Sequence, residues 1–229
     1  MDEAYCEAVN STFVKLYNDG LIYQGTRMIN WDPSGKTAVS NEEVIYKEEK
    51  GFLWHLKYPI KDTKDYLIVA TTRPETMLGD TAVAVNPKDK RYKKYVGKIV
   101  TIPIVGRKIK IIKDNYADPE QGTGALKITP AHDFNDYDVG QRNKLEIINV
   151  FTEDGKINRN APSSYIGLDR FEARKKILQE LKEKNFFVKE ENIKNKVPYG
   201  DRSNSVIEPF LTEQWFVNAK KLSIKAKKI

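Results

Sequence analysis

Between residues 43 and 112 the chain consists of short segments rich in β-branched and aromatic residues, separated by Gly, Pro, Asp and Asn. This punctuation constrains the fold most strongly, because each segment suits one strand and is too short for most helices. We expect strands at residues 43–46, 53–58, 66–72, 81–85, 99–102 and 108–112. Many short strands in succession indicate a β-barrel or a β-sandwich.

Helical periodicity is confined to a few stretches. Apolar residues at helical spacing predict a first helix near residues 5–17, ended by Asn18-Asp19-Gly20. Further helices are expected at 133–142 and 169–184, and extended segments at 21–31, 124–129, 147–151, 186–188 and 206–217. The expected fold class is therefore α+β, mainly β.

Composition excludes several classes of protein. The longest apolar run, about five residues, is too short to span a membrane. One cysteine excludes an internal disulfide and a zinc site built from several thiolates. The two histidines, His55 and His132, are too few for a typical metal phosphohydrolase, and a Ser-His-Asp hydrolase would lack its Gly-x-Ser-x-Gly elbow. We expect no metal and no cofactor.

The formal net charge of +7 leaves two interpretations open. A basic chain suits a polyanionic partner such as nucleic acid. A solvated, lysine-rich surface gives the same charge without any such partner.

The first candidate site is the segment Thr71–Thr76, at the end of an apolar strand. Thr72 and Glu75 fit a capping box, Pro74 suits the first turn of a helix, and Gly79 suits its end. Free backbone N–H groups beside the Arg73 guanidinium would bind a phosphate or a developing oxyanion. A purely structural strand-to-helix turn explains the same spacing.

The second candidate site lies in the segment 122–136. Lys127 and Thr129 alternate with apolar residues, so both side chains are expected on one strand face. Asp133 and Asp136 are one helical turn apart and share a helix face. Together these residues predict a small cup that suits an ammonium group and a hydroxyl group.

Several long motifs, in order along nearly the whole chain, resemble the valyl-tRNA synthetases of class I. The motifs are Leu21–Gly25, Asn30–Pro33, Thr37–Ser40, Thr71–Thr76 continuing into 79–85, Gly122–Asp136 and Ile207–Val217. Lys127 and Thr129 before Pro-Ala-His-Asp favour the valine type over the leucine type. The class I motifs His-x-Gly-His and Lys-Met-Ser-Lys-Ser, which form the adenylate, are missing.

The resemblance implies a β-barrel editing domain decorated with helices at residues 36–200. A helix and connecting strand at 1–35 would precede it, and residues 201–229 would return toward a catalytic domain. The expected activity is hydrolysis of the ester in mischarged threonyl-tRNA(Val), in the cytoplasm. The expected partners are the 3′ end of tRNA(Val) carrying threonine and the rest of a parent synthetase in cis, with no membrane. The alternative is a non-catalytic tRNA-binding module, which would have little use for two carboxylates that repel phosphate.

The resemblance also implies roles for single residues. The expected catalytic residues are Asp136, Asp133 and Thr76. The expected substrate-binding residues are Lys127, Thr129, Asp133, Asp136 and Thr72. The expected tRNA-binding residues are Arg73, Thr71 and Glu75. Gln121 stands where the family commonly has an aromatic residue, which changes one wall of the expected pocket.

Overall fold

The computed structural model describes residues 2–226, and the chain divides into two compact units. The first unit comprises Met1–Arg27 and Leu211–Ile229, and the second comprises Met28–Phe210. Both predicted sites fall within the second unit. The domain limits predicted after residues 35 and 200 stay a prediction.

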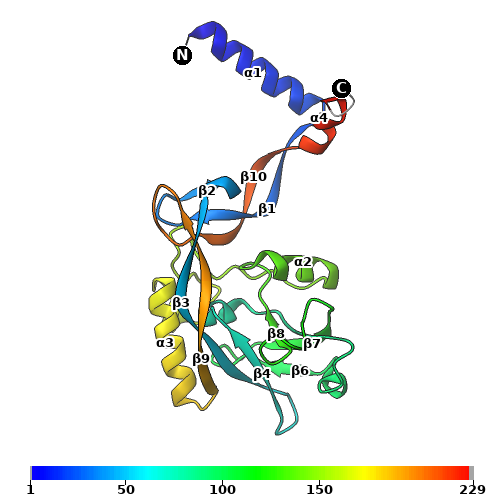
Figure 1. Cartoon of the computed structure of the whole chain (residues 1–229), viewed down its shortest axis with the longest axis vertical. Coiled ribbons are helices and arrows are strands. Elements are labelled where there is room, and N and C mark those ends of the chain that lie inside the picture. The colour runs from blue at the N-terminus through cyan, green and yellow to red at the C-terminus, as the bar shows by residue number, and fades with distance from the viewer. Residues whose placement is uncertain (1, 227–229) are drawn as a thin grey trace. The chain divides into compact units, whose positions relative to one another are not determined.

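The helices and strands follow one another along the chain as labelled in Figure 1. The α-helices are α1 (Glu3–Asn18), α2 (Phe134–Asn143), α3 (Arg170–Glu183) and α4 (Ala219–Ala226). The strands are β1 (Ile22–Asp32), β2 (Thr37–Val39), β3 (Val44–Pro59), β4 (Tyr66–Thr71), β5 (Ala82–Val85), β6 (Ile99–Thr101), β7 (Lys108–Lys113), β8 (Ala125–Ile128), β9 (Phe187–Gly200) and β10 (Glu208–Val217). Short 3-10 helices are η1 (Asn41–Glu43), η2 (Pro74–Gly79), η3 (Lys93–Tyr95) and η4 (Ser163–Tyr165).

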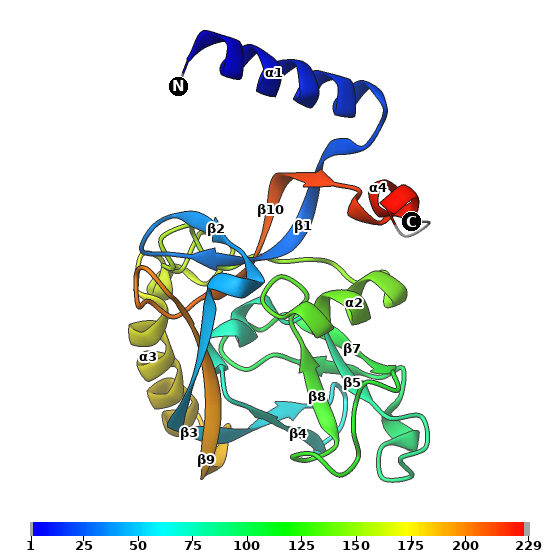
Figure 2. The ribbon, with the colours of Figure 1, turned by 45° about the horizontal axis from the view of Figure 1, so that its top comes forward.

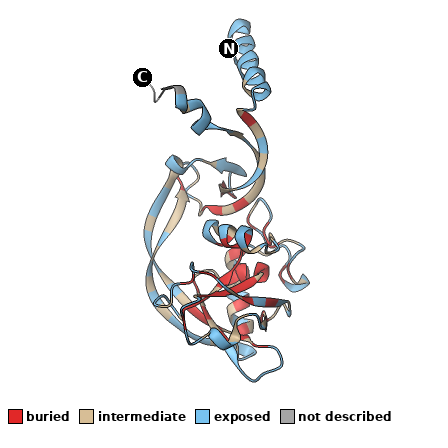
Figure 3. Cartoon of the chain, turned by 90° about the vertical axis from the view of Figure 1, so that its right-hand side faces the viewer, coloured by how far each residue is buried: buried red, intermediate tan, exposed pale blue. Residues whose placement is uncertain are grey.

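Helix α1 of the first unit confirms the helix predicted near residues 5–17. Its first turn is capped by the Asp2 carboxylate, which accepts a hydrogen bond from the Tyr5 backbone N–H at 2.8 Å. No residue between Glu3 and Asn18 is buried, as the pale blue of this helix in Figure 3 shows. Phe13 and Tyr17 instead pack edge-to-face on Trp215 of β10, with ring centroids 5.3 and 6.0 Å apart.

The second unit is built around two sheets that share one hydrophobic core. One has the strand order β4-β3-β9 and is antiparallel throughout. The other has the order β6-β7-β5-β8, in which β5 runs parallel to β7 and antiparallel to β8. Figure 2 shows α2 beside β8 and α3 beside the ribbon of β3 and β9.

Strand β5 is buried on both faces because it separates two hydrophobic cores. Val83 and Val85 face the main core, which also holds residues of β3, β4 and α3. Ala82 and Ala84 face a smaller core that is closed by Val139 of α2. Small side chains on this second face let α2 lie close to the sheet, and α2 carries one of the predicted sites.

Three strand predictions were wrong in their limits, and a fourth segment forms no strand. The segment predicted at 186–188 contains the start of β9, which runs on to Gly200. Residues 44–46 and 53–58 belong to one continuous strand, β3, because its pairing with β9 runs on through the charged stretch between them, and Glu43 belongs to η1. Residues 147–151 form no strand within residues 2–226, apart from a bridge between Phe151 and Ile157. The Asn158 amide donates to the carbonyls of Asn149 (3.0 Å) and Phe151 (3.1 Å), so a side chain replaces a neighbouring strand there.

The mainly β, α+β class is confirmed, but the closed barrel is not. Among the described residues the strands form three separate sheets, each with two free ends in its strand order. The sheets β4-β3-β9 and β6-β7-β5-β8 share the main core, and a bridge between Ile60 and Val100 joins them at one point.

The close approach at Gly79 gives a test of this packing. A Cβ atom at Gly79 would lie 2.7 Å from the Ile148 carbonyl oxygen, whereas a Cβ at Gly51 would meet nothing nearer than 3.6 Å. We expect Gly79→Ala to lower the free energy of unfolding by about 1–3 kcal/mol through overpacking, and Gly51→Ala to leave it unchanged or slightly higher. Urea unfolding of both variants measures the difference, and equal stabilities would contradict the packing described.

Candidate functional site

The two predicted sites meet in one pocket of about 220 Å³. The strand β8 and the start of α2 supply one side, and the end of β4 with η2 supplies the other. The predicted residues that line the pocket are Thr71, Thr72, Arg73, Thr76, Lys127, Thr129, Asp133 and Asp136. Glu75 does not line it and is completely buried. Residues more than fifty positions apart are therefore brought together as one site.

Lys127 is the centre of a buried polar cluster on the pocket floor. Its register partner Val83 lies opposite it, so the side chain enters the main core beside β5. The ammonium group donates to the Thr76 hydroxyl (2.8 Å), to Asp80 Oδ1 (3.1 Å) and to the Thr129 hydroxyl. The prediction that Lys127 and Thr129 share a strand face is thus confirmed.

Asp80 is the main residue that sequence reasoning missed. Its side chain is completely buried, and Oδ1 accepts from the Thr129 hydroxyl at 2.6 Å as well as from Lys127. The hydroxyl of Tyr58, also buried, donates to Oδ2 at 2.7 Å. The detectable signal was an acidic residue two positions before an entirely apolar strand, because a buried carboxylate needs a buried partner.

Burial shifts the titration of this cluster. It raises the pKa of Asp80, although Lys127, Thr129 and Tyr58 act in the opposite direction. Burial, with the nearby Asp80 charge, raises the pKa of Tyr58 well above its ordinary value. Tyr58 therefore keeps its proton and remains a donor to Asp80 at neutral pH.

The two aspartates have different environments. Asp133 is the N-cap of α2, and its Oδ1 accepts from the backbone N–H groups of Asn135 (2.8 Å) and Asp136 (3.1 Å). Asp136 is buried, and its Oδ2 accepts from the Thr129 backbone N–H at 2.8 Å. Hydrogen bonds among the described residues leave Asp136 Oδ1 for a ligand in the pocket. Burial, opposed by Lys127 and reinforced by Asp133, raises the pKa of Asp136 to about 7.

The turn at Thr71–Thr76 differs from the predicted capping box. The 3-10 helix η2 begins at Pro74 and ends at Gly79 as predicted, but its N-cap is Arg73. The Thr71 hydroxyl accepts from the Arg73 backbone N–H (3.0 Å), and the Thr76 hydroxyl donates to the Arg73 carbonyl (2.9 Å). The capping pair of Thr72 and Glu75 was wrong, because Glu75 turns into the protein to meet arginines instead.

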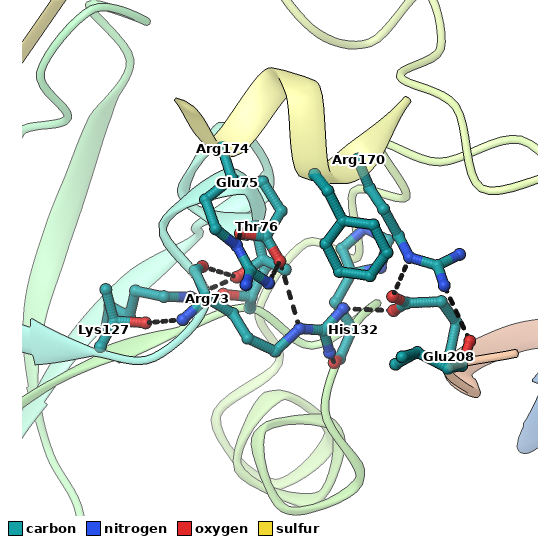
Figure 4. Close-up of polar contacts among 12 residues, drawn as sticks. Arg73, Glu75, Thr76, Lys127, His132, Arg170, Arg174 and Glu208 are labelled. Atoms are coloured by element: carbon teal, nitrogen blue, oxygen red, sulfur yellow. Dashed lines mark hydrogen bonds and ion pairs between the residues drawn. The ribbon is translucent and has the colours of Figure 1, made fainter. Parts of the chain in front are cut away.

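Arg73 and Glu75 belong to a chain of ion pairs drawn in Figure 4. Arg73 pairs with Glu208 and, at 3.5 Å, with Glu75, and it donates to the His132 carbonyl at 3.0 Å. Glu75 also accepts two hydrogen bonds of 2.7 Å from Arg174 of α3. Burial alone would raise the pKa of Glu75, but Arg174 and Arg73 bring it below its ordinary value. The predicted tRNA contacts of Arg73, Thr71 and Glu75 stay a prediction.

His132 has a structural role in the pocket wall. Its Nε2 accepts from the Val150 backbone N–H at 2.9 Å, which places a proton on Nδ1. Burial, with Arg73 and Lys127 nearby, lowers the pKa of His132 well below its ordinary value, so the ring stays neutral. Within residues 2–226 there is no group of three or more His, Cys, Asp or Glu side chains suited to a metal ion.

A second pocket, of about 620 Å³, adjoins the first. Leu53, Ala70, Tyr116 and Leu126 line both pockets. The second is otherwise walled mainly by the loop 115–124, which contains Gln121. In that loop Gly124 has a φ of +78°, and a Cβ there would lie 2.6 Å from the Arg91 guanidinium. The Gly-Thr-Gly sequence thus shapes the loop through its backbone.

Comparison with known proteins identifies the family. The family model described as "tRNA synthetases class I (I, L, M and V)" matches residues 1–229. The chain belongs to this family. It is 69% identical to a valine–tRNA ligase of Pelagibacter ubique (strain HTCC1062), over 100% of this chain and 26% of that protein. It is 56% identical to a valine–tRNA ligase of Dechloromonas aromatica (strain RCB), over 95% of this chain and 23% of that protein.

The predicted resemblance to valyl-tRNA synthetases is therefore confirmed, for about a quarter of the length of these curated relatives. A solved ternary complex of the Agrobacterium radiobacter K84 agnB2 LeuRS with tRNA and LeuAMS has a similar fold, with a TM-score of 0.50 at 17% identity. The match covers 81% of this chain and 31% of that chain. No helix among the described residues has the length and apolar character needed to cross a membrane.

The raised pKa of Asp136 predicts a pH dependence of stability. The folded protein holds a proton up to about pH 7 that the unfolded chain releases near pH 3.8. The contribution of Asp136 to stability therefore falls as pH rises between these values, by on the order of 3 kcal/mol in total. Urea unfolding at pH 4.5 and 7.5 measures it as the difference between the wild-type protein and Asp136→Asn. Asp138→Asn, an exposed position on the same helix, is the control, and parallel pH profiles for wild type and Asp136→Asn would contradict the prediction.

Proposed function

We propose that this chain is the editing site of a valyl-tRNA synthetase and hydrolyses the ester of threonyl-tRNA(Val). The observation that carries the proposal is the pairing of two features in one small pocket. The floor is a buried polar cluster around Lys127 and Thr129, and the wall holds Asp136 with one carboxylate oxygen left for a ligand. An amino acid that bears a hydroxyl group fits this chemistry.

Asp136 is the proposed partner of the α-ammonium group. In the free protein burial raises the pKa of this carboxyl to about 7, so the charged form is poorly stabilised. A substrate ammonium would supply the missing positive charge and lower that pKa. Binding is therefore expected to strengthen as pH rises through 7, as long as the ammonium keeps its proton.

The polar floor accounts for the choice between threonine and valine. The hydrophobic site at which a valyl-tRNA synthetase activates valine rejects threonine by only ~10²-fold, because the two side chains are nearly isosteric. A second site must therefore prefer the hydroxyl group. Valine, placed in the same pocket, would leave the Thr76 and Thr129 hydroxyls, which Lys127 holds in place, without a ligand partner, at about 1–3 kcal/mol for each unpaired group.

The chemistry requires no enzyme nucleophile, because the substrate is an activated ester. Water attacks the carbonyl carbon, the bond to the ribose oxygen breaks, and that oxygen takes up the proton released by the water. The products are free threonine and tRNA with a restored hydroxyl. In this scheme Asp136, Asp133 and Thr76 fix the position of the ester and the water, which is the main source of acceleration for such a reaction.

The second pocket is the proposed site of the terminal adenosine of tRNA(Val). It is large enough for a nucleoside and continues from the amino-acid pocket through residues that line both. Thr72 lies in the amino-acid pocket wall, at the boundary between acyl group and ribose in this scheme. The net charge of +7 favours a polyanionic partner. The proposal also includes the remainder of a synthetase as a partner in the same polypeptide, and a cytoplasmic location.

Deacylation of threonyl-tRNA(Val) and valyl-tRNA(Val) by the 229-residue chain tests the proposal. We expect the threonyl ester to be hydrolysed at least tenfold faster, and EDTA to leave the rate unchanged. Binding of both aminoacyl-tRNAs without release of either amino acid would instead support the tRNA-binding module. Equal rates for both esters would contradict a threonine-selective site.

Removal of the proposed ammonium partner should abolish hydrolysis. We expect Asp136→Ala to lower kcat/KM for threonyl-tRNA(Val) by about 30-fold or more, because loss of one partner of a desolvated charge pair costs about 2–5 kcal/mol. Asp138→Ala, on the exposed side of the same helix, is the matched control and should retain the wild-type rate. A folded Asp136→Ala protein with normal kcat/KM would exclude this role for Asp136.

A further inference from the structure

We infer that Asp80 is a positioning residue that fixes the direction of hydrogen bonding in the pocket, so that the substrate hydroxyl is recognised as a donor. Asp80 lies beneath the pocket and does not line it. It acts through Lys127 and Thr129, both of which do line it. The inference rests on the proposed function for the identity of the ligand, and its geometry stands on the free protein alone.

The ammonium group of Lys127 has its donors engaged by the protein. Such a group carries three N–H donors and no acceptor. They are directed to Thr76 Oγ1, Asp80 Oδ1 and Thr129 Oγ1. Lys127 therefore supports the hydroxyls around it and offers no further proton to a substrate that enters the pocket.

The hydroxyl of Thr129 has one proton, and it donates that proton in a hydrogen bond to Asp80. Oγ1 of Thr129 donates to Asp80 Oδ1 at 2.6 Å and accepts from Lys127. A hydroxyl oxygen accepts up to two hydrogen bonds, so one lone pair of Thr129 remains. Thr76 is in the same state, because its proton goes to the Arg73 carbonyl at 2.9 Å while its oxygen accepts from Lys127.

Asp80 Oδ1 keeps the proton of Thr129 directed toward it, away from the pocket. Its second oxygen is held by the Tyr58 hydroxyl at 2.7 Å, and both side chains are completely buried. Water, which could otherwise exchange donor and acceptor roles, has no access to this carboxylate. The cluster is thus a fixed arrangement in which every donor points away from the pocket.

The hydroxyls of this cluster therefore offer a ligand only acceptors. These are the remaining lone pairs of Thr76 and Thr129. A hydroxyl that donates satisfies one of them. A group of similar size without a proton leaves the acceptor unpaired and places a second electronegative atom against it. The pocket should therefore select a side-chain group that donates a hydrogen bond. A polar group of similar size without a proton should bind no better than an apolar one.

The first test uses the unaltered chain and ligands that cannot be hydrolysed. Three amides of 3′-amino-3′-deoxyadenosine are compared by calorimetry, carrying threonine, valine, or 2-amino-3-fluorobutyrate, in which fluorine replaces the hydroxyl group. We expect the threonyl amide to bind at least tenfold more tightly than the other two, which should bind alike. Binding of the fluoro amide within threefold of the threonyl amide would overturn the inference.

The second test removes Asp80 together with its counter-charge, because a lone buried charge would endanger folding. In Asp80→Ala/Lys127→Met the proton of Thr129 is released and can turn toward a ligand. We expect the ratio of affinities for threonyl and fluoro amides to fall to within threefold. Tyr58→Phe is the matched control, since it removes one buried partner of Asp80 and leaves Thr129 and Lys127 in place. It should keep the wild-type ratio.

A ratio of two affinities in one protein is insensitive to general loosening of the fold, because both amides share the ammonium and adenosine contacts. An unchanged ratio in the double variant, or a lost ratio in Tyr58→Phe, would exclude the role of Asp80.

Deacylation of threonyl-tRNA(Val) separates this inference from the proposed hydrolase function. Selective amide binding without deacylation refutes the hydrolase and retains the inference, whereas deacylation without amide selectivity refutes the inference. Failure of the threonyl amide to bind refutes both.

Discussion

The ion pair of Lys127 and Asp80 is the interaction on which the site depends. Two opposite charges are taken out of water at the junction of η2, β5 and β8, and neither would be tolerated there alone. The pair holds the Thr76 and Thr129 hydroxyls by direct hydrogen bonds. Because Thr129 also donates its backbone N–H to Asp136, the same residue holds that carboxylate in the pocket wall. Strand, turn and helix are therefore positioned by one buried charge pair.

A second set of buried charges holds the outer side of the turn. Glu208, at the start of β10, pairs with Arg73 and with Arg170 of α3, while Glu75 pairs with Arg174 of the same helix. Arg73 is the link between these ion pairs and the pocket, because its carbonyl accepts from Thr76 and its guanidinium donates to the His132 carbonyl. A positional change of Glu208 would therefore reach the pocket through Arg73, which gives this arginine a structural function beside its predicted contact with tRNA.

Periodicity and punctuation predicted most strands, α2, α3 and the pairing of Lys127 with Thr129 on one face, because these depend on local alternation and on turn residues. What they could not predict depends on partners distant in the chain. The continuity of β3 through residues 47–51 requires β9, about 150 residues later. The segment 147–151 reads as a strand, yet Asn158 and His132 satisfy its backbone instead. Glu75 fits a helix cap by spacing, but two arginines of other elements bind it more strongly. Asp80 has no local signature beyond its place before an apolar strand.

Asp80 and Asp136 are both buried near Lys127, but the two carboxylates have different protein partners. Asp80 has acceptor positions on both oxygens filled by the protein, and these contacts oppose the rise in its pKa that burial causes. Asp136 is nearly as buried but has one protein donor, and its pKa rises to about 7. A carboxylate left incomplete in this way costs stability in the free protein above pH 7, and either a proton or a cation in the pocket relieves that cost. The protein thus balances the charge that shapes the pocket and leaves unbalanced the charge that is to meet the ligand.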